Sequence, residues 1–487
     1  MDLILISKEG VEVHAHRAVL STCSPVFSTM LCGSMCESRT DRLPVQYSHA
    51  CILELLKFMY TDTLSTTLKT VETDLDFVIE LCYAADYYGC SALLRHIDNL
   101  LLSGPIYRVE QAVRILAALG EARGSGIQNT EAFRFLCLFL QRNLALIVGL
   151  GGSDPVVQVA LDELPSDVWI KVVESDETAV DELELFHVLH RWHQRQSDTK
   201  ACSRSSSGGE GRAEGGNADS SSSSSSSSEL FRKVRYGLIP MDKLVTDVKP
   251  TCMAPRDLYA MALEHHAHPP LSPFNATETL NVYAKPRAAN NGMPPPPQNG
   301  EIDTLVLVNP SRPPSKGLPI LTRQPTPIEG TDFVFKALIF PCGSRMGSPE
   351  HTSCFLHVAP RLLHDEAESN LKAHATSLAA SPAPSAAAAA PASGTSPPQK
   401  AGAGRWPSHP PVQYTLQCWD WQGQAFVKRQ DKYTFTPQHD DRGWHDFCQN
   451  TRSFGPSGVI VVRASARLQP EKPSQPAESS KDPRNAS

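Results

Sequence analysis

Four short segments of the sequence contain histidines or carboxylates at spacings that could support metal binding or acid–base catalysis. The first is "HAH", whose His14 and His16 would point to the same face of an extended strand. The others are "HDDRGWHDFC" (439–448), "HHAH" (265–268) and the stripe of His187, His190 and His193. A protein zinc site takes three or four ligands, and no further ligands stand in register with "HAH". We therefore expect no metal site in this chain.

The densest of these segments is 439–448, which contains His439, Asp440, Asp441, His445 and Asp446. Their spacing matches no known metal site or catalytic triad, so we predict a polar loop between strands. The three spaced histidines predict a partly solvated helix face. The sequence has no phosphate-binding glycine motif, no GxSxG and no HExxH. It therefore predicts a protein that is not an enzyme and needs no cofactor.

Composition excludes several other classes of function. The 45 basic and 52 acidic residues give a net charge of −7, whereas a nucleic-acid surface would need a basic face. No apolar run approaches the length that we expect of a membrane-spanning helix. The 13 cysteines are scattered without a CxxC pair, and several lie in apolar helical stretches: Cys51, Cys82 and Cys137. These features predict a cytoplasmic protein in a reducing compartment, with no nucleic-acid or membrane partner.

Composition also divides the chain into ordered regions and linkers. Three segments predict disorder within or between domains: a Ser/Gly-rich insertion at 198–229, a Pro-rich linker at 269–300 and an Ala/Pro-rich insertion at 366–404. A disordered tail is expected at 469–487. The ordered regions that remain are 2–103, 107–268 and 301–468.

The first region predicts a small α+β domain. "DLILI" and "VEVHAH", separated by "SKEG", are typical of a β-hairpin. Ser24–Pro25 is a helix-start signal, a capping serine before a first-turn proline. Two later helices show apolar faces at i, i+3, i+4 and i+7, and Gly89 can end the second. These faces are Ile52, Leu55, Leu56 and Met59, and then Val78, Leu81, Cys82 and Ala85.

The second region predicts helices and the third predicts strands. Thr178 to Asp181 fits a capping box before a helix whose apolar face is Leu185, Val188, Leu189 and Trp192. "FRFLCLFLQRNLALIV" and "LFRKVRYGLIPMDKL" predict two further amphipathic helices. Between Asp303 and Leu468, six β-prone runs indicate an antiparallel β-sandwich, with Trp419 and Trp421 on one strand face in core positions.

The order of motifs in the first region resembles a BTB/POZ domain. The resemblance rests on "VEVHAHRAVLSTCSPVFSTML", "MCESR", "ILELLKFMYTDTL" and "ELCYAADYYG" and covers 2–103. It implies that "HAHRAVL" leads from a strand into the first helical hairpin, so His16 and Arg17 are structural. Residues 107–268 resemble the all-α BACK domain that commonly follows BTB. The sandwich is similar to TRAF/MATH domains and to the galectin-3-binding-protein-like BTB subgroup.

This multidomain architecture implies a substrate adaptor of a cullin-3 RING ubiquitin ligase. In such adaptors the BTB domain binds the cullin, and the C-terminal domain recruits the protein to be ubiquitinated. Family members often carry an apolar-x-Glu motif in the loop that meets the cullin, and "SMCES" supplies Met35 and Glu37 at that place. An exposed methionine can fill a partner's groove while the carboxylate pairs beside it. Phe58, Met59 and Tyr60 complete the interface candidates, although Tyr60 could equally be a core residue.

One departure from the family keeps a second hypothesis open. BTB domains usually begin with a helix and strand that exchange between protomers, and Met1 falls almost on the first core strand. We expect either weakened homodimerisation or an incomplete N-terminus. In the second case the chain could be secreted, as members of the galectin-3-binding-like subgroup are, and the sequon at Asn275 would matter. The alternative function is then a non-enzymatic oligomeric scaffold.

Overall fold

A computed structural model describes residues 2–64, 75–102, 107–121, 126–151, 155–205, 229–268, 300–321, 325–361, 411–455 and 458–468, with a few residues between 274 and 298. The predicted insertion at 366–404 and the predicted tail at 469–487 lie outside these residues, as do Asn275 and most of the Pro-rich linker. Of the predicted Ser/Gly-rich insertion, 206–228 lie outside them. Its first residues continue a helix to Ser205, so the disorder predicted from 198 was wrong at that end.

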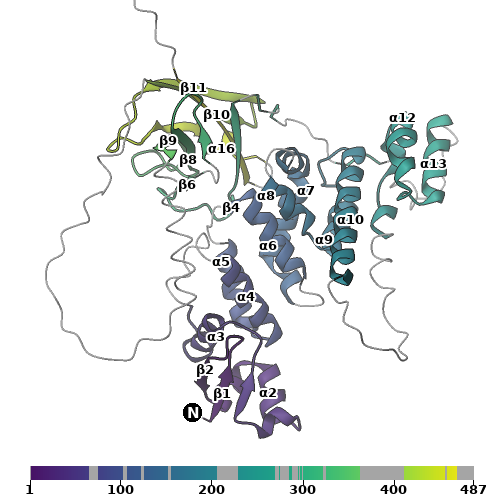
Figure 1. Ribbon diagram of the computed structural model, residues 1–487, viewed down its shortest axis with the longest axis vertical. Coiled ribbons are helices and arrows are strands. Elements are labelled where there is room, and N and C mark those ends of the chain that lie inside the picture. Colours follow the sequence, from purple (N-terminus) through teal and green to yellow (C-terminus); the bar gives the residue numbers. More distant parts are fainter. Residues whose placement is uncertain are drawn as a thin grey trace, which may run out of the picture.

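The N-terminal region is a three-stranded sheet with helices packed against it (Figure 1). The hairpin of β1 (Leu3–Ile6) and β2 (Glu12–Ala15) is confirmed, with Leu3 opposite Ala15. Strand β3 (Arg42–Pro44) pairs in parallel with β1. The helices are α1 (Arg17–Cys23), α2 (Pro25–Cys32), η1 (Cys36–Arg39), α3 (His49–Thr61), α4 (Leu75–Tyr87) and α5 (Ser91–Leu102).

Local capping sets the ends of these helices. Ser24 Oγ accepts a hydrogen bond from the Phe27 N–H at 3.0 Å, which confirms the predicted cap of α2. Gly89 follows α4 with a φ of +67°, a conformation that costs glycine little. Both predicted apolar faces, on α3 and α4, are buried in the core.

The second region is a stack of helices beside the BTB-like region (Figure 1). After a short strand β4 (Tyr107–Arg108) come α6 (Val109–Glu121), η3 (Gly126–Asn129), α7 (Glu131–Gly151), α8 (Pro155–Asp162), α9 (Ser166–Glu174) and α10 (Glu182–Ser205). Then follow η4 (Tyr236–Leu238), α12 (Met241–Lys243), η5 (Leu244–Val248), η6 (Lys249–Thr251) and α13 (Arg256–Ala267). The predicted apolar face of α10 is buried, from Leu185 to Trp192.

Two helix predictions in this region were wrong. Helix α10 begins at Glu182, and the Thr178 hydroxyl donates to the Val172 carbonyl at 2.6 Å instead of capping α10. The stretch "LFRKVRYGLIPMDKL" does not form one helix. Its helical turn ends at 232, and a short 3₁₀ turn, Tyr236–Leu238, precedes Pro240, which lacks the N–H that a helix interior needs.

Helix α7 corrects the expectation about apolar runs. Among the described residues, its segment Glu131–Gly149 is long and apolar enough to cross a membrane by length and composition alone. Half of that segment is buried inside the protein, where residues such as Phe133, Phe139 and Leu140 belong to the main core. The apolar character of α7 is therefore accounted for by packing among helices.

The C-terminal region is an antiparallel sandwich of two sheets, as predicted. One sheet has the order β11–β10–β13–β5–β4 and the other β12–β9–β8–β6, with β7 also pairing β8. The strands are β5 (Glu301–Leu307), β6 (Ile320–Leu321), β7 (Thr326–Pro327), β8 (Phe333–Phe340), β9 (His351–Pro360), β10 (Val412–Asp420), β11 (Ala425–Tyr433), β12 (Asp441–Gln449) and β13 (Val459–Leu468). A single helical turn, α16 (Asn450–Ser453), precedes β13. The polar loop predicted at 439–448 is mostly strand β12.

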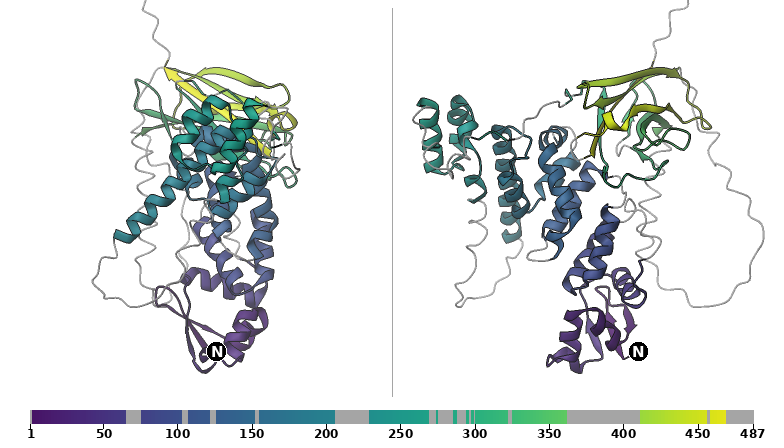
Figure 2. Two further views of the ribbon diagram at one scale, coloured as in Figure 1. Left: turned by 90° about the vertical axis from the view of Figure 1, so that its right-hand side faces the viewer. Right: turned by 180° about the vertical axis from the view of Figure 1, so that it is seen from behind.

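The sandwich packs against the helical region (Figure 2). Strand β4, from the chain between α5 and α6, pairs with β5 at the edge of one sheet. Residues alternate along β5 and β13. Leu305, Leu307 and Val461 pack into the helical core, whereas Val306 and Val462 pack between the sheets. Trp419 also joins the helical core, so its predicted core role is confirmed.

A second attachment lies in the segment predicted as a Pro-rich linker. Arg287 is buried, and its Nε donates to Glu182 at 2.5 Å while Nη1 donates to the Ser175 carbonyl at 2.7 Å. The buried Arg235 donates to the Lys285 carbonyl at 2.8 Å. Around 285–287 the chain is therefore bound to the start of α10 and does not extend freely.

Candidate protein-interaction surface

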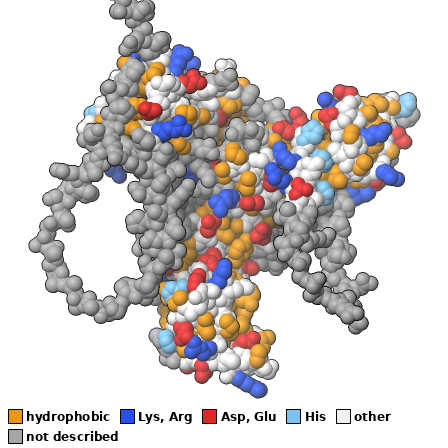
Figure 3. Space-filling model, in the orientation of Figure 1, with side chains coloured by type: hydrophobic (Ala, Val, Ile, Leu, Met, Phe, Trp, Pro, Cys, Tyr) orange, Lys and Arg blue, Asp and Glu red, His pale blue; other side chains and the backbone are white. Residues whose placement is uncertain are grey.

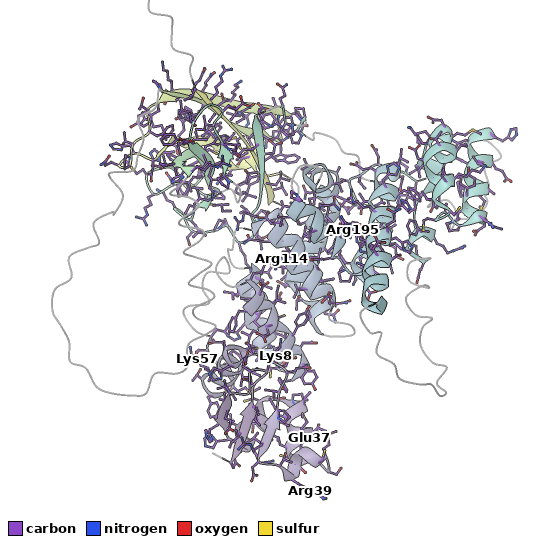
Figure 4. The ribbon with its side chains drawn as sticks, viewed as in Figure 1. Lys8, Glu37, Arg39, Lys57, Arg114 and Arg195 are labelled. Carbon is purple, nitrogen blue, oxygen red and sulfur yellow. The ribbon has the colours of Figure 1, made fainter. Side chains whose placement is uncertain are left out.

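The loop that contains Met35 and Glu37 presents both side chains at the far end of the N-terminal region. Figure 4 labels Glu37 and Arg39 there, at the end of the molecule opposite the sandwich. The side chain of Met35 is 47% exposed, which is unusual for a large apolar residue. The Ser38 hydroxyl donates to the Met35 carbonyl at 2.7 Å, and the Thr40 hydroxyl donates to the Glu37 carbonyl at 3.1 Å. These bonds shape the loop before any partner arrives.

The Glu37 carboxylate is held in its charged form. Its own backbone N–H and the Cys36 thiol both donate to it, the thiol at 3.2 Å, and together they lower the pKa of Glu37. An anionic oxygen therefore lies two residues from an exposed methyl thioether. This pair can offer one apolar contact and one charge-assisted hydrogen bond to a protein partner.

Arg17 fixes this loop to the rest of the domain. Its guanidinium donates to the carbonyl of Ser38, on η1, at 3.2 Å and also to the carbonyl of Thr40, directly after η1. Its backbone N–H donates to the Asp2 carboxylate at 3.0 Å, at the start of the sheet. The loop position thus depends on the first residue of α1, which agrees with the structural role expected for Arg17.

His16 makes a matching connection to the end of α3. The Tyr60 hydroxyl accepts from the His16 backbone N–H at 2.9 Å and lies 2.7 Å from His16 Nδ1. The Tyr60 side chain is 44% exposed, so it reaches the surface while holding the start of α1. Within the described part of the chain, no group of three or more His, Cys, Asp or Glu side chains could hold a metal ion. The contacts of His16 are those of a structural residue.

The other two interface candidates are core residues. Phe58 is 5% exposed and Met59 8% exposed. Phe58 packs edge-on to the ring of His96, and Met59 belongs to the apolar face that α3 turns inward. The prediction that Phe58 and Met59 lie at the surface was wrong, because the face of α3 that buries Ile52 and Leu55 also buries both of them. The candidate surface therefore consists of Met35, Glu37 and Tyr60.

The structure adds a groove that the sequence did not indicate. It has a volume of about 950 Å³ and lies between α4, α6, α8 and α10. Arg114, paired with Asp76 at 2.9 Å, and Arg195, near Asp162 at 3.7 Å, line it and are labelled in Figure 4. On these central helices hydrophobic, acidic and basic side chains lie side by side (Figure 3). No sequence motif marks this site, because its lining residues are spread from 76 to 196.

The polar segments considered for catalysis have structural contacts. Ser344 Oγ lies 2.6 Å from His445 Nδ1 and accepts from the Gly347 N–H at 3.2 Å, which braces the turn between β8 and β9. Asp446 accepts from the Ser348 N–H at 2.8 Å. In the 265–268 segment, a His266 ring nitrogen lies 2.8 Å from the Ile239 carbonyl, joining α13 to η4.

The histidine stripe on α10 is partly buried. Burial, followed by the neighbouring charges of His193 and His187, lowers the pKa of His190. The His190 ring stacks on Phe186, and the His193 ring meets Phe231 edge-on. His187 is exposed, whereas the His190 and His193 rings pack beside the core, so the stripe is the partly solvated helix face that was predicted.

Comparison with known proteins locates a family within the N-terminal region. Residues 1–104 match the BTB/POZ domain. Kelch-like protein 23 of Homo sapiens is 31% identical over 99 residues, which are 20% of this chain and 18% of that protein. Kelch-like protein 3 of Mus musculus is 34% identical over 70 residues, 14% of this chain and 12% of that protein. The match thus spans less than a fifth of either relative. The BACK, TRAF/MATH and galectin-3-binding-like resemblances remain predictions.

The matched residues include every part of the candidate surface. Met35, Glu37 and Tyr60 all fall within 1–104, on the sheet and helices described above. The fold, the motif order and the comparisons agree that residues 1–104 are a BTB/POZ domain within a multidomain chain.

Proposed function

We propose that this chain is a substrate adaptor of a cullin-3 RING ubiquitin ligase. The observation that carries the proposal is the preformed loop of the BTB/POZ domain, with Met35 exposed and Glu37 charged beside it. BTB domains of the resembling family meet the cullin through an apolar-x-Glu loop, and Met35 and Glu37 stand at that place. The proposed contact buries the Met35 thioether in a groove of the cullin and pairs the Glu37 carboxylate with a donor there.

The remainder of the chain has a proposed role in positioning. The helical region, which resembles a BACK domain, would set the distance between the cullin and the C-terminal sandwich. Its groove between α4, α6, α8 and α10 would receive a further segment of the cullin. The sandwich would recruit the protein substrate. Strand β4 joins the sandwich to the helices, and Arg287 joins the segment around 285–287 to them. The adaptor would therefore hold its substrate in a defined orientation.

The proposed cellular setting follows from the same reasoning. A cullin-3 ligase works in the cytoplasm, so we propose a cytoplasmic adaptor that supports ubiquitination. Homodimerisation through the BTB/POZ domain would present two sandwiches to one substrate. In this proposed role the chain needs no cofactor and catalyses no reaction itself.

Calorimetric titration with a cullin-3 N-terminal domain tests the proposal. The full chain is titrated beside the double variant Met35→Ala/Glu37→Ala. We expect micromolar or tighter binding by the unmodified chain. Burial of one methionine side chain is worth about 1.5–3 kcal/mol, so the double variant should bind at least ~10-fold more weakly.

A matched control separates a local effect from a general one. Met241, on α12, is 48% exposed, and Glu264 on α13 is also exposed. Met241→Ala/Glu264→Ala removes the same two side-chain types far from the loop and should leave the affinity unchanged. Absence of binding by the folded chain would overturn the adaptor proposal and favour the oligomeric scaffold. Equal weakening by both double variants would reject the loop as the site.

A further inference from the structure

Strand β11 forms a long, regular edge of the C-terminal sandwich. It has nine residues and pairs with β10 without a register shift, from Ala425 to Tyr433. It ends the strand order of its sheet, so no described strand pairs with its other side. Figure 1 shows β11 on the side of the sandwich that faces away from the helices. The row of backbone N–H and C=O groups at such an edge can pair with another extended chain.

The other described edges of the two sheets are short or capped. Strands β4, β6 and β7 have two residues each. Strand β12 is longer, but its pairing with β9 is irregular between Trp444 and Cys448. The Arg429 guanidinium, which comes from β11, also donates to the Asp446 carbonyl at 2.7 Å and to the Phe447 carbonyl at 3.3 Å. An irregular edge whose carbonyls are already bonded is a poor template for a further strand.

The solvent-facing side of β11 is basic. Its exposed positions alternate along the second half of the strand and are Lys428, Gln430 and Lys432. Each carboxylate in the strands of this sheet is already paired with an arginine: Glu301 and Asp303 with Arg463, Asp420 with Arg452, and Asp431 with Arg442. The positive charges of the two lysines are therefore not compensated by the strands of their own sheet.

The other side of β11 offers apolar contacts. Val427 and Tyr433 are partly buried and pack against the apolar cluster between the sheets. A strand added beside β11 would place apolar residues next to these two side chains and polar residues next to Lys428 and Lys432. Directly opposite residues on antiparallel strands have Cβ atoms about 4.5–5.5 Å apart, so opposite charges attract there and like charges repel.

Charge decides which strand fits this edge. Two copies of β11 that paired antiparallel around Gln430 would place Lys428 of one copy opposite Lys432 of the other, so a second copy of this chain is repelled. A strand with acidic residues at the same two positions is attracted. The lysines thus select an acidic partner and protect the edge from self-association.

We propose that β11 binds an acidic, extended segment of the protein substrate, which adds a strand to this edge of the sandwich. The segment has the pattern apolar-acidic-x-x-x-acidic-apolar. Its acidic residues pair with Lys428 and Lys432, and its apolar residues lie beside Val427 and Tyr433. This inference rests on the proposed adaptor function and names the class of substrate that the sandwich recruits.

Fluorescence polarisation of the full chain with a labelled peptide, VETTTEV, tests the charge pattern. Lys428→Ala/Lys432→Ala should weaken binding at least ~5-fold, and Lys428→Glu/Lys432→Glu should bind the charge-reversed peptide VKTTTKV instead. Lys8→Ala/Lys57→Ala is the matched control, since both lysines are exposed and lie in the N-terminal region (Figure 4). The control should keep the affinity. No binding of VETTTEV, or equal weakening by both alanine variants, would overturn the inference.

Methylation of the peptide's backbone nitrogens tests strand addition without any change to the protein. One version of VETTTEV is methylated at its odd positions and the other at its even positions, which removes the N–H donors of one strand edge at a time. Because an added strand pairs through one edge, one version should bind like the parent peptide and the other at least ~10-fold more weakly. Equal binding by both versions would contradict strand addition.

Titration of the same chain with the cullin-3 N-terminal domain separates this inference from the adaptor proposal. Cullin binding without peptide binding would overturn the β11 site and leave the adaptor proposal standing. Peptide binding without cullin binding would overturn the adaptor proposal and leave β11 as a site for acidic segments.

Discussion

Replacement of Arg287 by alanine should destabilise the helices that bind it by about 3–5 kcal/mol, the usual cost of removing one partner from a buried ion pair. The Arg287 and Glu182 side chains are 2% and 4% exposed, and their closest atoms are 2.5 Å apart. The same guanidinium donates to the Ser175 carbonyl at 2.7 Å, a bond that would also be lost. Among the described residues, the Arg235 N–H, at 3.1 Å, would still donate to the buried Glu182 carboxylate.

The value should lie toward the lower end of that range. One guanidinium nitrogen of Arg287, Nη2, is buried and has no hydrogen-bond partner among the described residues, which reduces what the arginine contributes. The burial of the guanidinium also lowers the pKa of Arg287, against the opposing effect of Glu182. The double variant Glu182→Gln/Arg287→Met removes both charges and keeps an acceptor for Arg235. It should therefore recover more than half of the loss.

Native-state hydrogen exchange of the α9 and α10 amides is the appropriate assay, because it reports local opening in a chain with several domains. Arg312→Ala is the matched control. Arg312 is 41% exposed and lies 4.0 Å from Glu131, which is 71% exposed. An exposed pair of this kind is worth about 0–1 kcal/mol. If Arg287→Ala cost no more than Arg312→Ala, the segment around Arg287 would be a free linker after all.

Three further predictions concern single residues. Hydrogen bonds from Lys285 and Arg235 lower the pKa of Asp176 to about 2, so its stabilising effect is complete above about pH 4 and lost as the pH falls toward 2. Asp176→Asn should remove that pH dependence, as measured by acid titrations followed by circular dichroism. The stability lost should be no more than about 1 kcal/mol, because the carboxylate is half exposed. Gly458→Ala should lower the free energy of unfolding, measured by chemical denaturation, by more than about 2 kcal/mol, because its φ is +82° and a Cβ would overlap the Val308 carbonyl. Gly300→Ala is the control: its φ is +81° but the space around it is open, so the loss should be only about 1 kcal/mol. Phe27→Ala should cost about 3–5 kcal/mol in the same assay, since Phe27 is fully buried and stacks on Tyr88 at 4.1 Å; a loss below 1 kcal/mol would contradict that packing.

Much of the fold could be predicted because the decisive information is local. The period of Ile52, Leu55, Leu56 and Met59 predicts the buried face of α3, and the cap at Ser24 predicts the start of α2. In the sandwich, alternation along the β-prone runs predicts antiparallel strands. These signals arise from neighbours within a few residues in sequence, so they survive without knowledge of the tertiary structure.

The structural predictions failed where contacts with residues distant in the sequence determine the local structure. Arg287 sits among prolines, and only Glu182, 105 residues earlier, explains why it is buried. Strand β12 resembles a loop because it is an edge strand with mostly polar residues, and its two buried residues, Phe447 and Cys448, lie beside an irregularity in its pairing with β9. Thr178 fits a capping motif, but the Val172 carbonyl captures its hydroxyl.

The candidate surface was partly predictable for the same reason. The motif placed Met35 and Glu37 on a loop, and the loop is exposed. Phe58 and Met59 were misplaced although the helical period of α3 already pointed Met59 inward. The groove between α4 and α10 could not be predicted, since it exists only after four helices have packed.

The most direct test of the central claim is hydrogen–deuterium exchange of the full chain with and without a cullin-3 N-terminal domain. The adaptor account predicts slower exchange in residues 34–41, around η1, and at the end of α3 near Tyr60, with the sandwich strands unchanged. Protection confined to the sandwich or to α12 and α13, with 34–41 unaffected, would contradict it.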